Sequence, residues 1–310
     1  MKIKVYIDGQ EGTTGLEIVE RLEKRSDLEL LKIDSALRKD PKERQRLMNQ
    51  SDYTFLCLPD LAAIEAVALI ENPAVKVIDA STAHRTHVDW AYGFPELSNS
   101  HRQNIQTSKR VAVPGCYASG FAALVYPLVT AGIMPNDYPI VCHATSGYSG
   151  GGKQTIQTYE EANRSIEYDA PRLYALEQKH KHLKEMQAIS RLAYPPIFNP
   201  VIADYYQGMA VAIPLHTRLL GEKKSVQQLQ DFFENYYQDQ AFIKVQPPLA
   251  TGFLATNGVV ASNELEIFIS GHEEQILLVA RLDNLGKGAS GAAVQCLNLM
   301  MGIDETTSLI

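Results

Sequence analysis

The sequence predicts an α/β protein with a doubly wound parallel sheet of the Rossmann type, followed by an α+β domain with a mixed or antiparallel sheet. Strand-like and helix-like segments alternate from residue 3 to residue 79, and such alternation builds parallel doubly wound sheets. After residue 116 the segments are mostly strands, with few helices between them. That order is typical of α+β domains.

The elements of the first part follow at short intervals. Short apolar stretches predict strands at residues 3–7, 28–33, 53–57, 75–79 and 110–113. Helical periodicity predicts helices at residues 15–24, 42–49 and 61–70. Because ligands of doubly wound sheets bind at the carboxyl ends of the strands, the loops after these strands are the expected binding site.

The second part continues with a helix at residues 118–130. Strands are predicted at residues 140–143, 207–213, 264–270 and 275–282, and helices at residues 225–237 and 292–300. We expect the last helix to pack back on the first domain. A chain of 310 residues is long enough for two domains.

Composition excludes several classes of protein. Apolar residues make up 45% and charged residues 21%, with a formal net charge of −7, so we expect a globular protein that binds neither nucleic acid nor an anionic membrane. The four cysteines are scattered, which predicts no disulfide framework and no thiolate metal site. The longest apolar run, residues 121–134, falls short of the ~20 residues of a membrane span. With no export signal in view, we expect a cytoplasmic protein.

A cysteine stands at the start of the helix that follows residues 110–113. The first helical turn carries unpaired N–H groups and a partial positive charge, which favour a thiolate and can hold a developing oxyanion. Pro114 and Gly115 predict a turn that exposes the side chain. Cys116 is therefore the candidate nucleophile, and a buried structural cysteine is the alternative.

A glycine-rich loop joins the first strand to the first helix, where backbone N–H groups can approach a pyrophosphate. Its spacing, G-x-x-G-x-x-G, departs by one residue from the commoner dinucleotide fingerprint, so a tight turn without a ligand is the alternative. The residues predicted to bind a dinucleotide here are Gly9, Gly12, Thr13, Thr14 and Gly15.

Cofactor choice is expected just after the second strand, where a carboxylate favours a free ribose and cations favour a 2′-phosphate. Asp34 favours NAD, whereas Ser35, Arg38 and Lys39 favour NADP. We predict NADP, with Ser35 and Arg38 among its contacts. Solvated surface charge is the alternative role for Arg38 and Lys39.

Among eight histidines, His216 is the candidate acid/base, because a strand-like segment precedes it and its near-neutral pKa suits proton transfer. His180 and His182 are two residues apart and would point to different faces of a helix, so we predict no metal site. The hydroxyl-rich loop Thr145–Lys153 could cradle a phosphate or carboxylate. A glycine-rich hairpin without a ligand is its alternative.

Six motifs together resemble the N-acetyl-gamma-glutamyl-phosphate reductases, NADPH-dependent enzymes of arginine synthesis, in their short form. The resemblance runs in order through nearly the whole chain. The motifs are Gly9-x-x-Gly12-x-x-Gly15, Asp79-Ala-Ser-Thr-Ala-His-Arg85, Tyr92-Gly-Phe-Pro-Glu-Leu97, Pro114-Gly-Cys-Tyr117, Ser146-Gly-Tyr-Ser-Gly150 and Asp283-Asn-Leu-Gly-Lys-Gly-Ala-Ser-Gly-Ala-Ala-Val294.

The resemblance implies a Rossmann domain over residues 1–115, completed by a helix in residues 286–310, and a catalytic and dimerisation domain over residues 116–285. It implies a homo-oligomer, dimer or tetramer, with NADPH as cofactor. It also implies Cys116 as nucleophile and His216 as acid/base. Further implied contacts are Ser81, Asn284, Gly286 and Gly288 for the cofactor, and Ser146, Gly147, Ser149 and Lys153 for the substrate, with Lys153 standing where the long form usually has arginine.

The expected reaction reduces N-acetyl-L-glutamyl 5-phosphate to the semialdehyde through a thioester on Cys116, because covalent catalysis divides a hard reduction into two easier steps. The same chemistry on aspartyl phosphate or the amino-adipyl analogue is the nearest alternative. A nucleotide-sensing protein without catalysis is another. A reductase that passes hydride directly, without a covalent intermediate, is a third.

Overall fold

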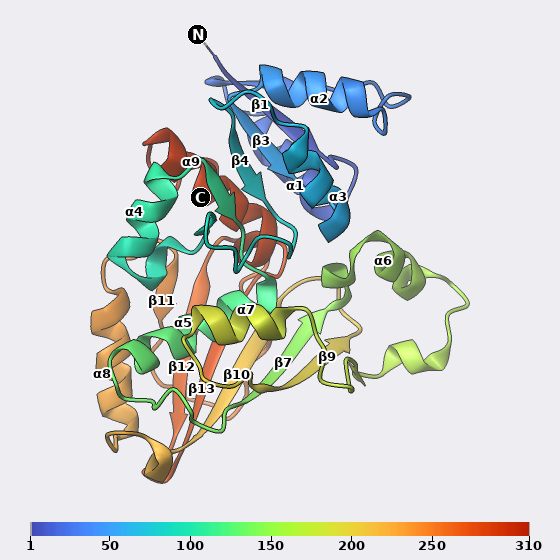
Figure 1. Ribbon diagram of the computed structural model, residues 1–310. Coiled ribbons are helices and arrows are strands. Elements are labelled where there is room, and N and C mark those ends of the chain that lie inside the picture. The colour runs from blue at the N-terminus through green and yellow to red at the C-terminus, as the bar shows by residue number, and fades with distance from the viewer. Residues whose placement is uncertain (1, 310) are drawn as a thin grey trace. The chain divides into compact units, whose positions relative to one another are not determined.

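The computed structural model describes residues 2–309 and divides into two compact units. One unit contains the chain up to Pro114 together with the segment from Ala289 onward, and the other contains Gly115–Gly288. The boundaries expected from the sequence lie at residues 115/116 and 285/286. Each unit has its own sheet (Figure 1).

The first unit is built on a six-stranded sheet in the order β2-β1-β3-β4-β6-β5, and every pair of neighbours is parallel. The predicted doubly wound parallel sheet is therefore confirmed. Its strands are β1 (Ile3–Asp8), β2 (Leu28–Leu31), β3 (Tyr53–Leu56), β4 (Lys76–Asp79), β5 (Ala91–Tyr92) and β6 (Arg110–Ala112). Its helices are α1 (Thr13–Leu22), α2 (Pro41–Gln50), α3 (Asp60–Ala68), α4 (Asn99–Thr107) and α9 (Gly291–Met301).

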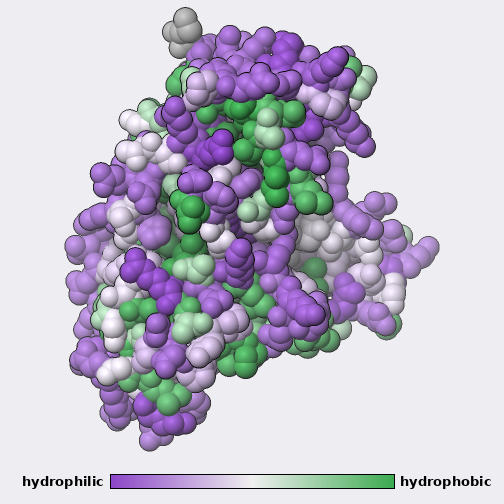
Figure 2. Space-filling view, viewed as in Figure 1, coloured by the Kyte–Doolittle hydropathy of each residue, from purple (hydrophilic) through white to green (hydrophobic). Residues whose placement is uncertain are grey.

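The C-terminal helix α9 is part of this first unit, as expected. It contacts α1, α4 and β4, and the Tyr53 hydroxyl donates a hydrogen bond of 3.1 Å to the Met300 carbonyl. A buried cluster that includes Tyr6, Met48 and Leu56 forms the core. The surface over α2 is almost uniformly hydrophilic (Figure 2), because Leu47 and Met48 are its only buried residues.

The second unit is built on a seven-stranded mixed sheet in the order β11-β12-β13-β10-β7-β9-β8. The predicted α+β unit with a mixed sheet is confirmed. Its strands are β7 (Val141–Gly147), β8 (Arg172–Leu173), β9 (Ile197–Ala203), β10 (Met209–His216), β11 (Ile243–Val245), β12 (Leu265–Gly271) and β13 (Gln275–Leu282). Its helices are α5 (Cys116–Thr130), α6 (Gly152–Glu160), α7 (His182–Ile189) and α8 (Val226–Tyr237).

Helix α5 packs against β10 and β13 of this sheet, and Figure 1 shows α5, α7 and α8 over one of its faces. Close packing requires a glycine, because a Cβ on Gly120 would lie only 2.7 Å from Val211 Cγ2. The α5 side chains from Tyr117 to Leu128 are all buried. Although α5 is strongly apolar, the part of the chain from residue 2 to 309 holds no helix with the length and hydropathy of a membrane span.

Candidate active site

Cys116 is the first residue of α5, directly after the extended residue Gly115. The helix runs for 15 residues, long enough for a full set of aligned peptide dipoles behind the thiol. Cys116 is partly exposed, whereas Cys142 and Cys296 are buried. Burial and the neighbouring carboxylates raise the pKa of Cys57 to about 12, so that thiol stays protonated at neutral pH. Cys116 is the cysteine with the geometry of a nucleophile.

The last residues of the second unit, 283–288, form a closing segment that packs against this cysteine. A Cβ built on Gly288 would lie 2.7 Å from Cys116 Cβ and 3.0 Å from the Asp283 carbonyl oxygen. Neither Cys116 Cβ nor the Asp283 backbone oxygen is the end of a flexible side chain, so neither atom can rotate away. Gly288 therefore packs directly on Cys116 within this unit, and its predicted role as a cofactor contact stays a prediction.

A hydrogen bond joins α7 to the start of α5. The Gly115 N–H donates to a carboxylate oxygen of Glu185 at 2.8 Å, and Glu185 is 2% exposed. His182 precedes Glu185 by three residues, which places both on one face of α7. His182 is also buried, and its ring centroid lies 5.9 Å from that of Tyr117. The His182 imidazole therefore lies beside Tyr117, the residue that follows Cys116.

Two tyrosines and a second histidine surround His182. The Tyr174 hydroxyl donates to the Tyr117 hydroxyl at 3.0 Å, and the His180 ring packs edge-on against both tyrosines and His182. Burial raises the pKa of Tyr117 well above its usual range. Burial, with Lys181 nearby, lowers the pKa of His180 to about 4. His180 is therefore a neutral imidazole at physiological pH.

The structure does not bring His216 and Cys116 together, and the acid/base role of His216 stays a prediction from the sequence. Gly120, in the second turn of α5, packs against Val211, and His216 lies five residues further along β10, about 17 Å away along the strand. The His216 N–H instead donates to the hydroxyl of Tyr138 at 2.7 Å, beyond the far end of α5. His216 lines a separate pocket of about 480 Å³ at that end of the sheet.

The predicted substrate loop is held by an adjacent loop. The N–H groups of Gly147, Tyr148 and Ser149 donate to carbonyls of residues 208, 205 and 206, at 2.9, 2.9 and 3.0 Å. A Cβ on Gly147 would lie 2.6 Å from two of these carbonyl oxygens. Ser146 and Ser149 are buried, so the loop is a fixed structure rather than a flexible hairpin.

Asn284 joins the closing segment to this loop. Its amide nitrogen donates to Ser149 Oγ at 2.9 Å, and its amide oxygen accepts from the Gly208 N–H at 2.8 Å. Gly286 also contacts protein, because a Cβ there would lie 2.0 Å from the Ser262 carbonyl oxygen. Both residues pack within this unit against the loops around Ser149 and Ser262, and their predicted roles as cofactor contacts stay predictions.

Lys153 lies apart from the two serines. It is exposed on α6. There it lines a shallow hollow, together with other residues of α6 such as Gln157 and Glu160 and with the residue that follows the helix. Among the described residues, the lining of that hollow includes neither Ser146 nor Ser149. The structure therefore gathers Ser146, Gly147 and Ser149 but leaves Lys153 outside the group.

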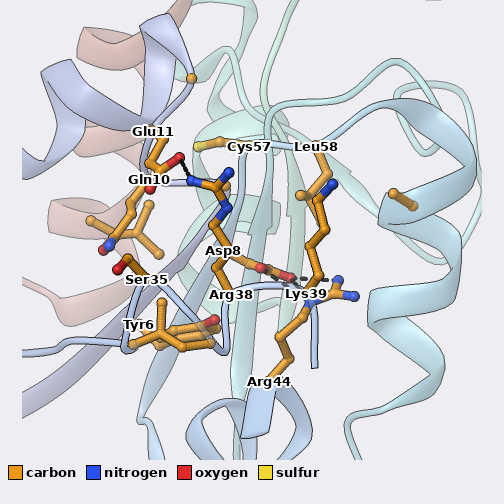
Figure 3. Close-up of a pocket in the computed structure, with 15 residues that line it drawn as sticks. Tyr6, Asp8, Gln10, Glu11, Ser35, Arg38, Lys39, Arg44, Cys57 and Leu58 are labelled. Carbon is orange, nitrogen blue, oxygen red and sulfur yellow. Dashed lines mark hydrogen bonds and ion pairs between the residues drawn. The ribbon is translucent and has the colours of Figure 1, made fainter. Parts of the chain in front are cut away.

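The first unit has a pocket of about 450 Å³ at the carboxyl ends of β1, β2 and β3 (Figure 3). It is lined by Gly9, Gly12, Ser35 and Arg38 of the predicted cofactor residues. Gly9 has a φ of +84°, and a Cβ there would lie 2.3 Å from the Cys57 carbonyl oxygen. Only glycine fits at this position, where the loop passes close to the backbone at the end of β3.

Three cations line the same pocket. Arg44 donates to buried Asp8, with Nη2 2.8 Å from Oδ2, and Arg38 forms an ion pair with Glu11. Lys39 makes no ion pair with any described residue, and its side chain points along the pocket in Figure 3. The pocket therefore offers positive charge at the position where a 2′-phosphate is bound in this class of fold.

The other predicted cofactor residues lie near this pocket or at a neighbouring strand end. Thr13 and Thr14 begin α1. Gly15 packs closely on the glycine loop, because a Cβ on Gly15 would lie 2.4 Å from the Gly9 carbonyl oxygen. Ser81 follows β4 and donates to Asp79 at 2.7 Å. The described lining of the pocket includes none of these four residues, so their part in nucleotide binding stays a prediction.

Family models match both units. Residues 4–105 match the semialdehyde dehydrogenase NAD binding domain, and residues 116–284 match the semialdehyde dehydrogenase dimerisation domain. The chain belongs to the semialdehyde dehydrogenase family. The resemblance seen in the sequence motifs is confirmed, because curated members that are similar over nearly their full length carry the expected family name.

The similarity to these members of the semialdehyde dehydrogenase family is extensive. The chain is 47% identical to "N-acetyl-gamma-glutamyl-phosphate reductase 2" of Nostoc sp., over 99% of both chains. It is 48% identical to the protein of the same name from Pseudomonas putida, over 96% of both chains. An aspartate semialdehyde dehydrogenase II from Vibrio cholerae shares the fold, with a TM-score of 0.73 at 15% identity over 97% of this chain and 99% of the other.

Sequence reasoning missed that α7 lies against the start of α5, where Glu185 accepts from the Gly115 N–H. His182 and Glu185 at a spacing of three, just after a helix start, were the available signal, since that spacing places two side chains on one helical face. Among residues 2–309 the structure has no group of three or more His, Cys, Asp or Glu side chains placed to hold a metal ion.

Proposed function

We propose that this chain reduces N-acetyl-L-glutamyl 5-phosphate to N-acetyl-L-glutamate 5-semialdehyde, with release of phosphate, in arginine biosynthesis. The observation that carries the proposal is Cys116, partly exposed at the N-terminus of a 15-residue helix in the unit that matches the family's dimerisation domain. The proposed substrate is taken from the names of the relatives at 47% and 48% identity.

NADPH is the proposed cofactor. The glycine loop and the cations Arg38 and Lys39 fit its pyrophosphate and its 2′-phosphate, because the one provides close backbone approach and the others positive charge. When bound, NADPH supplies the hydride that reduces the acyl group to the aldehyde level. The protein's part is to hold and orient the reactants.

The chemistry of the chain's own residues begins at Cys116. Its thiolate attacks the acyl carbon, the bond from that carbon to the phosphate oxygen breaks, and a thioester on Sγ and free phosphate result. The N–H groups at the start of α5 face the position where the oxyanion develops. After reduction, the carbon–sulfur bond breaks, and the thiolate and the semialdehyde are released.

His182 is our candidate for the acid/base, in place of His216. It shares a face of α7 with Glu185, which is bonded to Gly115 beside the nucleophile. In this role its imidazole takes the Cys116 proton and delivers it to the departing phosphate. Ser146, Gly147 and Ser149 are the proposed substrate contacts, and Lys153 remains a prediction from the sequence.

The decisive test compares three acyl phosphates. NADPH oxidation by the purified chain is measured with N-acetyl-glutamyl phosphate, aspartyl phosphate and the N-acetylated amino-adipyl analogue. We expect the largest kcat/KM with the first. An equal or larger value with aspartyl phosphate would contradict the proposed substrate, and binding of NADPH without turnover of any of the three would favour a nucleotide sensor.

Variants test the residue roles. Cys116→Ser should abolish turnover and the thioester that mass spectrometry detects in the unchanged chain, whereas near-full turnover would favour direct hydride transfer. His182→Asn should lower kcat by about 10²- to 10⁴-fold, the usual contribution of a general acid/base. His216→Asn is the matched control and should leave kcat nearly unchanged. The opposite order would restore His216 to the site.

We also propose that the chain forms a homo-oligomer through the second unit, which matches the family's dimerisation domain. Ile197 on β9 and Leu277 on β13 of the mixed sheet are 58% and 40% exposed, which is apolar surface that a second copy could bury. A cytoplasmic location is proposed as well, and its support is that all four cysteines are free. Light scattering and fractionation test these two points.

A further inference from the structure

We propose that Glu11 is a specificity-determining residue of the nucleotide pocket. Its carboxylate holds Arg38 in the absence of a 2′-phosphate and gives Arg38 up to the 2′-phosphate of NADPH. The inference rests on the proposed use of NADPH and adds a residue that no motif assigned, because Glu11 lies between the glycines of the loop and is not one of them.

The ion pair joins two loops that line the pocket. Glu11 belongs to the loop that joins β1 to α1, and Arg38 belongs to the turn that follows β2. Figure 3 shows their side chains pointing towards one another, with Nη1 of Arg38 donating to Oε2 of Glu11. The guanidinium that is predicted to bind the 2′-phosphate is therefore already paired within the protein.

A second pair in the same pocket shows what a permanent pairing looks like. Arg44 and Asp8 have side chains that are 14% and 3% exposed, and removing one partner would leave a charge buried alone. The side chains of Arg38 and Glu11 are 50% and 48% exposed, so water can solvate either of them. The Arg44–Asp8 pair is part of the folded structure, whereas the Arg38–Glu11 pair can open.

The exchange of partners is favourable for chemical reasons. An exposed pair between carboxylate and guanidinium contributes little, whereas a phosphate monoester carries nearly two charges and accepts bidentate hydrogen bonds from arginine. Lys39 lines the same pocket and adds attraction for the phosphate. Glu11 raises the pKa of Arg38 by its hydrogen bond, and Arg38 stays charged with or without this partner.

The two cofactors then differ in their response to Glu11. NADPH must displace the carboxylate to reach Arg38, while NADH has no 2′-phosphate and leaves the ion pair intact. Glu11 therefore weakens NADPH binding and does not affect NADH binding. This asymmetry distinguishes a competing carboxylate from a general effect of negative charge near the pocket.

The test measures the Kd of NADPH and of NADH, by titration of their fluorescence, for the full chain and four variants. Glu11→Gln should lower the Kd of NADPH by about two- to five-fold, the range expected from loss of one exposed pair, and leave the Kd of NADH unchanged. Arg38→Gln should raise the Kd of NADPH. In the double variant, the Glu11 substitution should have no further effect. Glu20→Gln on α1, an exposed site with the same charge change, should alter neither Kd.

Three results would overturn the proposal: equal tightening for both cofactors, a Glu11 effect that persists without Arg38, or an equal effect from Glu20→Gln. Failure of the proposed use of NADPH would give a different set of binding results. If the unchanged chain binds neither cofactor, or binds NADH more tightly than NADPH, the assignment of NADPH falls. If it binds NADPH preferentially and ignores Glu11→Gln, only the role of Glu11 falls.

Discussion

Substitution of Gly288 by alanine should disable the nucleophile without a change in any reacting group. The added methyl carbon would lie 2.7 Å from Cys116 Cβ and 3.3 Å from Cys116 Cα. Carbon atoms in contact prefer about 3.5–4.0 Å, so the overlap is about 1 Å. Gly288 is not among the glycines with a positive φ, so steric overlap, and not backbone conformation, is the cause.

The size of the effect follows from this overlap. Either Cys116 or the closing segment must move by about 1 Å, and a displacement of that size at reacting atoms lowers rates by about 10²-fold. In free energy of activation this corresponds to about 2.7 kcal/mol. Overpacking of a well-packed region lowers the free energy of unfolding by about 1–3 kcal/mol, which leaves a two-unit protein of this size folded.

Three measurements separate activity from folding: kcat for NADPH oxidation, the rate of Cys116 alkylation by iodoacetamide, and the midpoint of thermal unfolding. Gly252→Ala is the matched control, because a Cβ there has nothing within 4 Å and should leave all three nearly unchanged. The reasoning fails if Gly288→Ala keeps kcat within a few-fold of the unchanged chain. It fails equally if both alanine variants lose the same activity.

Three further predictions concern residues around this centre. Glu185→Ala removes the acceptor of the Gly115 N–H and should lower the free energy of unfolding by about 1–3 kcal/mol, more than Glu185→Gln does, as urea denaturation can measure. The pKa of His180 is about 4 in the folded state against an ordinary 6.5, so the unfolded state binds more protons between these values. Stability should fall by at most about 3 kcal/mol as the pH drops from 6.5 through 4, and His180→Gln should remove that part of the pH dependence. Asn284→Ala releases Ser149 and should raise the KM of the acyl phosphate by about three- to ten-fold; a rise in the KM of NADPH alone would instead support the cofactor role predicted from the sequence.

The parallel sheet of the first unit was predictable because its signals are local. Each strand and helix between residues 3 and 79 is a short apolar or amphipathic stretch, and consecutive elements become neighbours in such folds. Cys116 was predictable for the same reason, since Pro114 and Gly115 place it at a helix start within a few residues of sequence. Elements with weak local patterns, such as the nine-residue α4 and the two-residue β5, were missed.

The proposed acid/base, His182, was not predictable by the same means. His216 follows a strong strand pattern, but the register of β10 decides which end of the sheet it occupies, and register is set by distant partners such as Ser146 and Gln275. His180 was judged as a helical residue, whereas α7 begins at His182. The hydrogen bond from Gly115 to Glu185 spans 70 residues and leaves no mark in the local pattern.

The last part of the chain contributes to both units: Gly288 lies against Cys116, and α9 packs on α1, α4 and β4. During synthesis on the ribosome these late residues emerge after everything they support. A nascent or prematurely terminated polypeptide therefore lacks the segment that seats the thiol and the helix that covers the parallel sheet.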